Sequence, residues 1–139
     1  LYRILVSPPT PISFRQIMDQ GGVLIANLAK GRLGDDSSSV MGGLLASTLS
    51  LAALSRAEEP TDARRPFHIY IDEFQSFTTL AFANMLPELR KYGVSMTLAH
   101  QHSFQLEPEV RHAVWGNAGT SITFRTGAED AELLAKQFQ

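Results

Sequence analysis

The sequence lacks several features that would assign a protein to a class at once. It has no cysteine, which excludes disulfides and thiolate metal sites. Twelve basic and fourteen acidic residues give a formal net charge of −2, so the composition carries no whole-chain signature of nucleic-acid binding. The longest strongly apolar helical stretch, 40–54, contains glycine, serine and threonine, and we judge it too short and too polar to span a bilayer.

The length and the composition favour one globular domain. A chain of 139 residues can bury one hydrophobic core, and 44% hydrophobic and 19% charged residues are typical of soluble proteins. No signal peptide opens the chain, which begins with Leu1 rather than methionine, and we interpret it as a piece of a longer protein. We expect residues 1–139 to form a single domain, with a strand and a linker over 1–12.

The stretch that organises the rest is 67–74, Phe-His-Ile-Tyr-Ile-Asp-Glu-Phe. Four of its first five residues are apolar, which favours a central parallel strand covered by helices on both faces. Asp72 and Glu73 then fall at the carboxyl edge of the sheet, where α/β folds bind ligands. In phosphoryl-transfer enzymes an Asp here helps to hold magnesium, and the following Glu can activate water. The alternative is a strand that ends in two solvated acids, and these eight residues leave both interpretations open.

Strand and helix patterns alternate along the chain, which predicts an α/β fold with a mostly parallel sheet flanked by helices. Capping boxes start two of the helices, at Ser13 with Gln16 and at Thr126 with Glu129, and Pro87 is expected to kink or split a third. Besides the central strand, strands are expected over 2–6, 23–26, 94–99 and 120–124, and helices over 14–18, 35–57, 80–92, 110–115 and 126–138.

In a parallel sheet, the residues that follow each strand meet at one edge. Acidic, amide and cationic side chains should therefore converge on that edge, as a nucleotide site requires. The residues concerned are 27–30, Asp72 with Glu73, His100 with Gln101, and Arg125.

These residues also carry a family pattern. The chain resembles the carboxyl-terminal half of the RecA-like motor domain of conjugative and type IV secretion coupling ATPases, the TraG/TraD-like branch of the HerA–FtsK superfamily. The resemblance covers nearly everything from Ser13 onward, in the order and spacing of that family. The matching segments are NLAKGRLG at 27–34, YIDEF at 70–74, ELRKYGV at 88–94, AHQ at 99–101, GNAG at 116–119 and FRTGAEDAELL at 124–134.

The resemblance implies a role for individual residues. Asp72 corresponds to the Walker B aspartate, which holds Mg²⁺ through water, and Glu73 to the base that activates the attacking water. Gln101 resembles the glutamine that senses the γ-phosphate. Arg90 resembles an arginine finger acting on a neighbouring subunit, which is worth on the order of 10³–10⁵ in rate in other phosphoryl-transfer enzymes. Lys30 and Arg125 join the residues expected to bind nucleotide.

Simpler interpretations exist for several of these residues. Arg90 lies in the last turn of a helix, where the helix dipole favours any cation. Lys30 and Arg32 fit solvated loop charges as well as contacts to DNA phosphates or nucleotide. His100, His102 and His112 suggest a metal site, but His-x-His on a loop without a third fixed ligand is a weak pattern, and we reject it.

The chain departs from the family in one respect. No Gly-x-x-x-x-Gly-Lys-Ser/Thr segment occurs, and none of the three lysines follows a glycine. The resemblance therefore implies a partial RecA-like P-loop NTPase fold without the Walker A segment, whose first strand and helix we expect upstream of Leu1. ATP and Mg²⁺ are expected as cofactors of the full-length parent, whereas this piece should bind ATP poorly and be inactive by itself.

We thus predict a part of an ATP-driven motor that moves DNA in conjugative transfer. The expected partners are DNA, further copies of the parent in a ring (a hexamer), and a relaxosome or accessory protein, with no membrane contact from this segment. The expected location is the cytoplasm, at the cytoplasmic face of the bacterial inner membrane if the parent is attached there. The competing hypothesis is a non-enzymatic docking module that recruits a DNA-processing or accessory protein. A small-molecule-binding α/β domain ranks last because no glycine-rich dinucleotide turn occurs.

Overall fold

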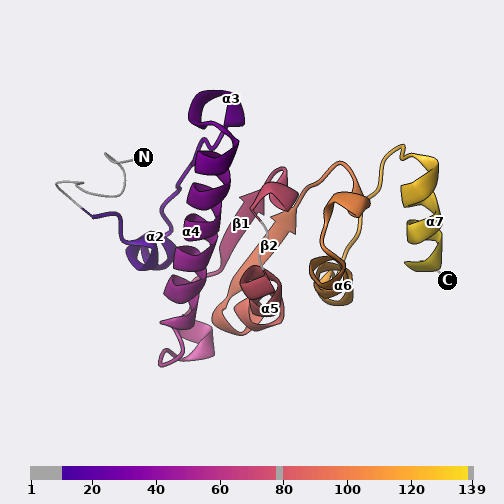
Figure 1. Cartoon of the computed structure of the whole chain (residues 1–139). Coiled ribbons are helices and arrows are strands. Elements are labelled where there is room, and N and C mark those ends of the chain that lie inside the picture. The colour runs from indigo at the N-terminus through magenta and orange to yellow at the C-terminus, as the bar shows by residue number, and fades with distance from the viewer. Residues whose placement is uncertain (1–10, 78–79, 138–139) are drawn as a thin grey trace.

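The computed structural model describes residues 11–77 and 80–137, which form helices around a small parallel sheet (Figure 1). This mixture is compatible with the predicted α/β class. The expected strand over 2–6 lies outside the described residues. The α-helices are α2 (Phe14–Gln20), α3 (Lys30–Leu33), α4 (Asp35–Leu54), α5 (Leu80–Leu89), α6 (Pro108–Asn117) and α7 (Ala128–Gln137). The strands are β1 (Phe67–Ile71) and β2 (Val94–Leu98), and 3₁₀ turns occur at η1 (Thr61–Ala63), η2 (Phe74–Ser76), η3 (Arg90–Tyr92) and η4 (Ser103–Gln105).

The two strands are parallel, as the sequence predicts. Their register pairs Phe67 with Val94 at one end and Ile71 with Leu98 at the other. The pairing continues beyond both ends, because Phe67 N–H donates to the Gly93 carbonyl and Ala99 N–H donates to the Ile71 carbonyl, each at 2.9 Å. The carboxyl ends of β1 and β2 therefore lie at the same edge.

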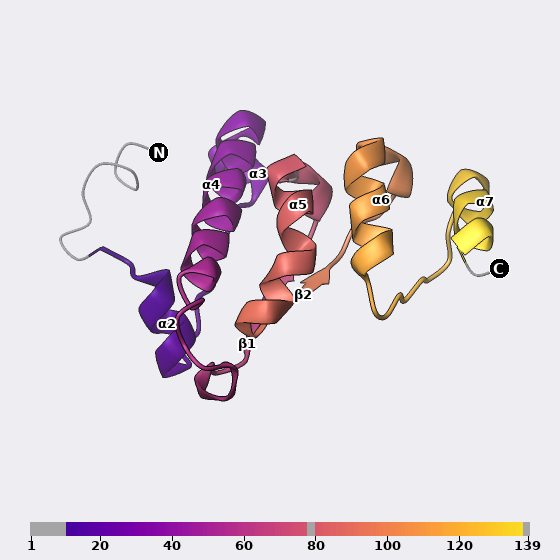
Figure 2. The same cartoon turned by 90° about the horizontal axis from the view of Figure 1, so that it is seen from below.

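Burial on both faces of β1 was a wrong prediction. Ile69 is buried, but its neighbours His68 and Tyr70 point to the other face, where Tyr70 is 75% exposed. Helices α4 and α5 pack together over the covered side, as Figure 2 shows from below. Tyrosine and phenylalanine count as apolar in a pattern, yet both also occur on a wet face, so the pattern could not separate the two cases.

Two further predicted strands do not form in the part of the chain that the structure describes. Residues 23–26 lie alongside β1 but are separated from it by a groove of about 1150 Å³, so they make no ladder hydrogen bonds with it. Residues 120–124 lie beyond α6, away from β2, and leave Ile122 and Phe124 exposed (Figure 1). Both segments have strand composition, but a strand also needs a backbone neighbour to accept and donate its hydrogen bonds.

Local capping signals are more reliable guides. The Ser13 side chain accepts a hydrogen bond from Gln16 N–H at the start of α2, as the capping box predicts. Gly93 adopts the left-handed conformation at the end of η3 and stops the turn before β2. Helix α5 runs through Pro87 and ends two residues later, where the chain tightens into η3.

Helix α4 begins at Asp35, as expected, and ends at Leu54, three residues before the expected end, so it extends beyond the apolar stretch 40–54 only at its start. Its 20 residues begin at Asp35, so the argument that this element is too short to span a bilayer does not hold: by length and composition alone, α4 could cross one. Core helices of soluble proteins meet the same criterion. Here α4 packs against α2, α3 and α5, and it buries one stripe of small and apolar residues that includes Met41, Ala46 and Ala53.

Two adjacent glycines of α4 offer a matched test of this packing. A Cβ atom on Gly42 would lie 2.0 Å from the Phe77 ring, whereas a Cβ on Gly43 would meet nothing within 4 Å. Gly43→Ala should therefore raise the free energy of unfolding by about 0.5–1 kcal/mol through helix propensity. Gly42→Ala should lower it by about 1–2 kcal/mol, because overpacking outweighs that gain. Urea unfolding of the two variants measures both, and equal shifts of the same sign would contradict the packing of Phe77 on α4.

The Arg56 side chain joins elements that are far apart in sequence. It is fully buried just after α4, and its guanidinium donates to Asp19 (Nε to Oδ1, 3.0 Å) and to the carbonyls of Arg65 (3.0 Å) and Tyr92 (3.2 Å). Burial would raise the pKa of Asp19, but hydrogen bonds from Arg15 and Arg56 outweigh it and hold that pKa below its usual value. Arg56 thus ties α2, the segment before β1 and the turn before β2 to one point.

We expect Arg56→Met to lower the free energy of unfolding by about 3 kcal/mol, because it leaves the carbonyls of Arg65 and Tyr92 without this donor and removes one of the two arginines that pair with Asp19. Chemical denaturation followed by circular dichroism measures this loss. Arg32→Met provides the control, since Arg32 is exposed and should change stability by less than about 0.5 kcal/mol. A loss as small as that of the control would show that Arg56 does not hold these elements together.

Candidate functional site

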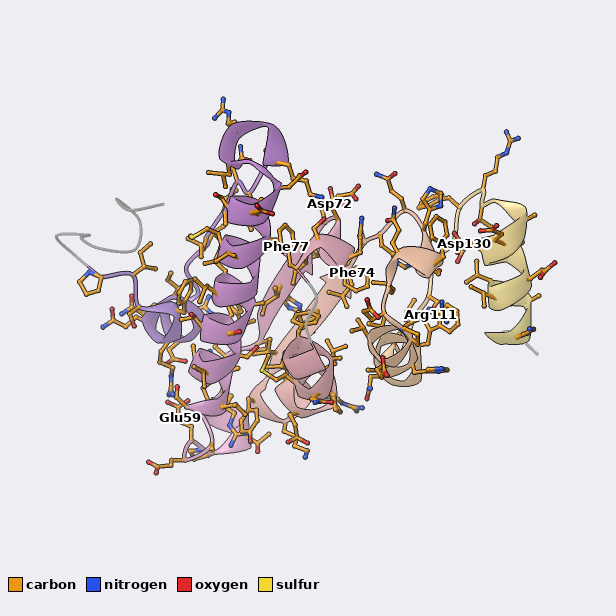
Figure 3. All side chains as sticks on the ribbon, viewed as in Figure 1. Glu59, Asp72, Phe74, Phe77, Arg111 and Asp130 are labelled. Atoms are coloured by element: carbon orange, nitrogen blue, oxygen red, sulfur yellow. The ribbon has the colours of Figure 1, made fainter. Side chains whose placement is uncertain are left out.

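The residues that follow β1 and β2 meet at the carboxyl edge of the sheet. Asp72 and Glu73 come directly after β1, and Gln101 lies three residues after β2. The Gln101 side-chain amide donates a hydrogen bond to Oε1 of Glu73, which joins the ends of the two strands. Figure 3 shows Asp72 at this edge, above Phe74 and Phe77. The predicted convergence of Asp72, Glu73 and Gln101 is therefore confirmed.

Glu73 has an unusual backbone conformation. Its φ of 51° and ψ of 42° lie in the left-handed region, which costs a residue with a side chain on the order of 1–2 kcal/mol. Three hydrogen bonds hold the turn: Glu73 N–H donates to Oδ1 of Asp72 (3.0 Å), Phe74 N–H to the Ala99 carbonyl (3.1 Å), and Ser76 N–H to the Glu73 carbonyl (2.9 Å). Residues held in such conformations cluster at functional sites.

The buried ring of Phe74 anchors this turn. Its side chain is 1% exposed, and its ring meets the His100 ring edge-on, with centroids 5.2 Å apart. Because His100 follows β2 and Phe74 follows β1, this contact fixes the two loops of the edge to each other. Burial lowers the pKa of His100, partly opposed by the charge of Asp130, so the neutral imidazole is favoured in this contact.

The carboxylate of Glu73 is stabilised in its charged form. Hydrogen bonds from Gln101 and from Gln75, together with the charge of Lys30, hold its pKa below the ordinary value. Glu73 is therefore ionised at neutral pH and accepts hydrogen bonds without donating one. A carboxylate fixed in this way can orient a water molecule and take up its proton.

Lys30 lies on the side of this edge next to α4. It opens the short helix α3, is exposed, and places its Nζ 3.9 Å from Oδ1 of Asp35. The groove between residues 21–30 and β1 extends to Lys30, Asp72 and Glu73, and α4 forms part of its lining. One cation and two carboxylates thus lie at one end of a groove.

Arg90 and Arg125 do not lie with Lys30, Asp72, Glu73 and Gln101 at this edge of the sheet. Arg90 lies in η3, before β2, and so at the opposite end of the strands from Asp72. Five strand residues at roughly 3.3 Å each separate the two ends by about 16 Å. Arg125 is exposed in the segment between α6 and α7, which both ribbon views place on the far side of α6 from β1 (Figures 1 and 2).

His100 and His102 contact other side chains of the protein. His102 Nδ1 lies 3.4 Å from Oδ2 of Asp130, while Oδ1 of that buried carboxylate accepts a hydrogen bond from Ser103 N–H at 3.0 Å. Asp130 therefore attaches α7 to η4, as its position in Figure 3 shows. Over residues 11–77 and 80–137, no group of three metal-ligating side chains occurs.

Sequence reasoning missed Gln75 and Asp130. Gln75 lies two residues after Glu73 in a turn, and its amide donates to Oε2 of Glu73 at 2.5 Å. The signal available in the sequence was a polar glutamine between two phenylalanines, in Phe-Gln-Ser-Phe. An acid such as Asp130 in the first turn of a helix is already explained by the helix dipole, and its position in the sequence does not indicate a contact with η4.

Comparisons with known proteins give one match. The chain shows no significant similarity to a curated protein, and none to a solved structure. Residues 66–138, about half of the chain, match the family model described as the TraM recognition site of TraD and TraG. The match includes β1, β2, Asp72, Glu73 and Gln101, whereas Lys30 lies outside it. The chain therefore belongs to the TraM recognition site family of TraD and TraG, in agreement with the TraG/TraD-like resemblance.

Proposed function

We propose that this chain is part of an ATP-driven motor that moves DNA in conjugative transfer, and that Glu73 is its catalytic base. The observation that carries the proposal is the hydrogen bond from Gln101 to Glu73 across two parallel strands. It places an ionised carboxylate, a second acid and an amide at the carboxyl edge of a sheet, where α/β enzymes bind ligands. Family membership supplies the conjugative context.

The residues at the edge fit a magnesium nucleotide. Asp72 is exposed and offers carboxylate oxygen, the ligand type that Mg²⁺ prefers, and Lys30 brings a positive charge near Glu73. When bound, Mg²⁺ neutralises charge on the phosphates. In this proposal Asp72 holds the ion through water, Lys30 contacts the nucleotide, and the backbone N–H cradle for the phosphates comes from outside residues 1–139.

Glu73 and Gln101 have different roles in the proposed hydrolytic step. Glu73 orients the attacking water and accepts its proton, which requires the charged form that the neighbouring amides favour. Gln101 bridges the carboxylate and the expected position of the γ-phosphate, so it can report the presence of that phosphate to β2. General-base catalysis of this kind contributes about 10²–10⁴ in rate.

Arg90 acts on a neighbouring subunit in this proposal. Arg90 is exposed, and strands about 16 Å long separate its end of the sheet from Asp72, so we do not expect it to serve the same site. In a ring, that end of one subunit can face the carboxyl edge of the next. A RecA-like fold of the HerA–FtsK type, a hexameric ring and DNA as the moved substrate belong to this same hypothesis.

The test replaces the base in the full-length protein that carries these residues. Glu73→Gln keeps shape but cannot accept the proton, so ATP turnover should fall at least about 100-fold while nucleotide binding is retained. Glu58→Gln is the matched control, because Glu58 is exposed in the loop before β1 and should leave turnover unchanged. Turnover of Glu73→Gln equal to that of the control would remove Glu73 from the mechanism.

A second function is favoured by the family match itself. The family is described as the TraM recognition site of TraD and TraG, so residues 66–138 are a candidate docking surface for TraM, a partner of the accessory type. The two functions are compatible, since recognition of TraM and hydrolysis of ATP would use different parts of one protein.

Substitution of two equally exposed apolar residues can test whether TraM binds the matched region or the rest of the chain. Phe124 lies inside it and Val23 outside it, and both are 86% exposed. We expect Phe124→Ser to weaken TraM binding by about tenfold or more, as loss of an exposed aromatic anchor does, and Val23→Ser to leave it unchanged. Calorimetric titration of the chain with TraM measures both. Absence of binding, or equal effects of the two substitutions, would contradict recognition through 66–138.

A further inference from the structure

The carboxylate of Glu73 is held on both of its oxygens. Gln101 donates to Oε1 from the loop after β2, and Gln75 donates to Oε2 at 2.5 Å from η2. The two amides come from different elements, so together they fix the plane of the carboxylate, which one hydrogen bond could not do. A carboxylate has about four lone-pair sites, and this arrangement leaves others for a water molecule.

We propose that Gln75 is a positioning residue for Glu73, which with Gln101 fixes the orientation of the carboxylate for its work as a base. The inference rests on the proposed function for its catalytic meaning. The arrangement of the three side chains stands independently of that function.

The local backbone explains why a residue only two positions away can reach the carboxylate. The left-handed conformation of Glu73 reverses the chain direction, and η2 then brings Gln75 back toward the Glu73 side chain. Phe74 N–H donates to the Ala99 carbonyl, and Phe77 N–H donates to the Phe74 carbonyl at 2.9 Å. The contact between Gln75 and Glu73 therefore requires the strained backbone of Glu73, which is a functional reason for that strain.

The charge of the site agrees with this geometry. Gln101, Gln75 and Lys30 all lower the pKa of Glu73, in that order of effect for the two amides. Loss of the Gln75 amide should leave the carboxylate held on one oxygen only, so that its plane can turn about the hydrogen bond to Gln101. Loss of a glutamine that merely filled space near the turn would have no such effect.

The experiment measures the χ1 and χ2 rotamer populations of Glu73 from three-bond scalar couplings in this chain. Gln75→Met keeps the length of the side chain but removes the donor, so Glu73 should change from one dominant rotamer to an average over several. Gln75→Glu puts a negative charge beside the carboxylate and should displace it further. The exposed Gln105→Met is the control and should leave the Glu73 couplings unchanged. Amide spectra of β1 and β2 check that each variant is folded.

Unchanged Glu73 couplings in both Gln75 variants would overturn the proposal. Turnover of the full-length protein then tests the role itself. Because a base must be oriented toward the attacking water, kcat of Gln75→Met should fall about tenfold or more, with little change in KM. If the couplings change and kcat does not fall, the orientation of Glu73 does not matter for turnover, and the proposed function fails while the contact between the side chains remains.

Discussion

The parallel pairing of β1 with β2 is the constraint on which the rest of the molecule depends. Because both strands run the same way, the loops at their carboxyl ends lie together, and Glu73 meets Gln101. The same direction sends Arg90 to the opposite end. An antiparallel pair with the same residues would separate Glu73 from Gln101 and place the acids beside the turn that contains Arg90 instead. The site therefore forms only if the two strands are parallel, whatever the side chains at their ends.

Packing maintains this pair although only one of its faces is covered. Ile69 and Val94 lie in a core cluster with Ala53 of α4 and Leu89 of α5, and Phe74 lies in the neighbouring cluster below the acidic turn. Each hydrophobic cluster thus supports one end of the strands. Buried apolar area supplies most of that stability, whereas the left-handed backbone of Glu73 subtracts from it. Such a cost at one residue is expected where function requires a fixed orientation.

Sequence patterns predicted the local features and the consequences of strand topology. The cap at Ser13, the parallel direction of the central strands and the meeting of Asp72, Glu73 and Gln101 were all predictable. Features that depend on a distant partner were not. Residues 23–26 and 120–124 have strand composition but no paired neighbour, the buried Arg56 serves two remote carbonyls, and Gln75 reaches Glu73 only because the backbone turns left-handed.

The contact between Glu73 and Gln101 tests the account most directly. Nuclear Overhauser cross peaks from the Gln101 side-chain amide protons should appear to the side-chain methylenes of Glu73 in the folded chain. Cross peaks between the strands should match the parallel register, with Ile69 opposite Met96. An amide of Gln101 that gives no cross peak to Glu73, together with strand contacts in antiparallel order, would contradict the arrangement from which the function is inferred.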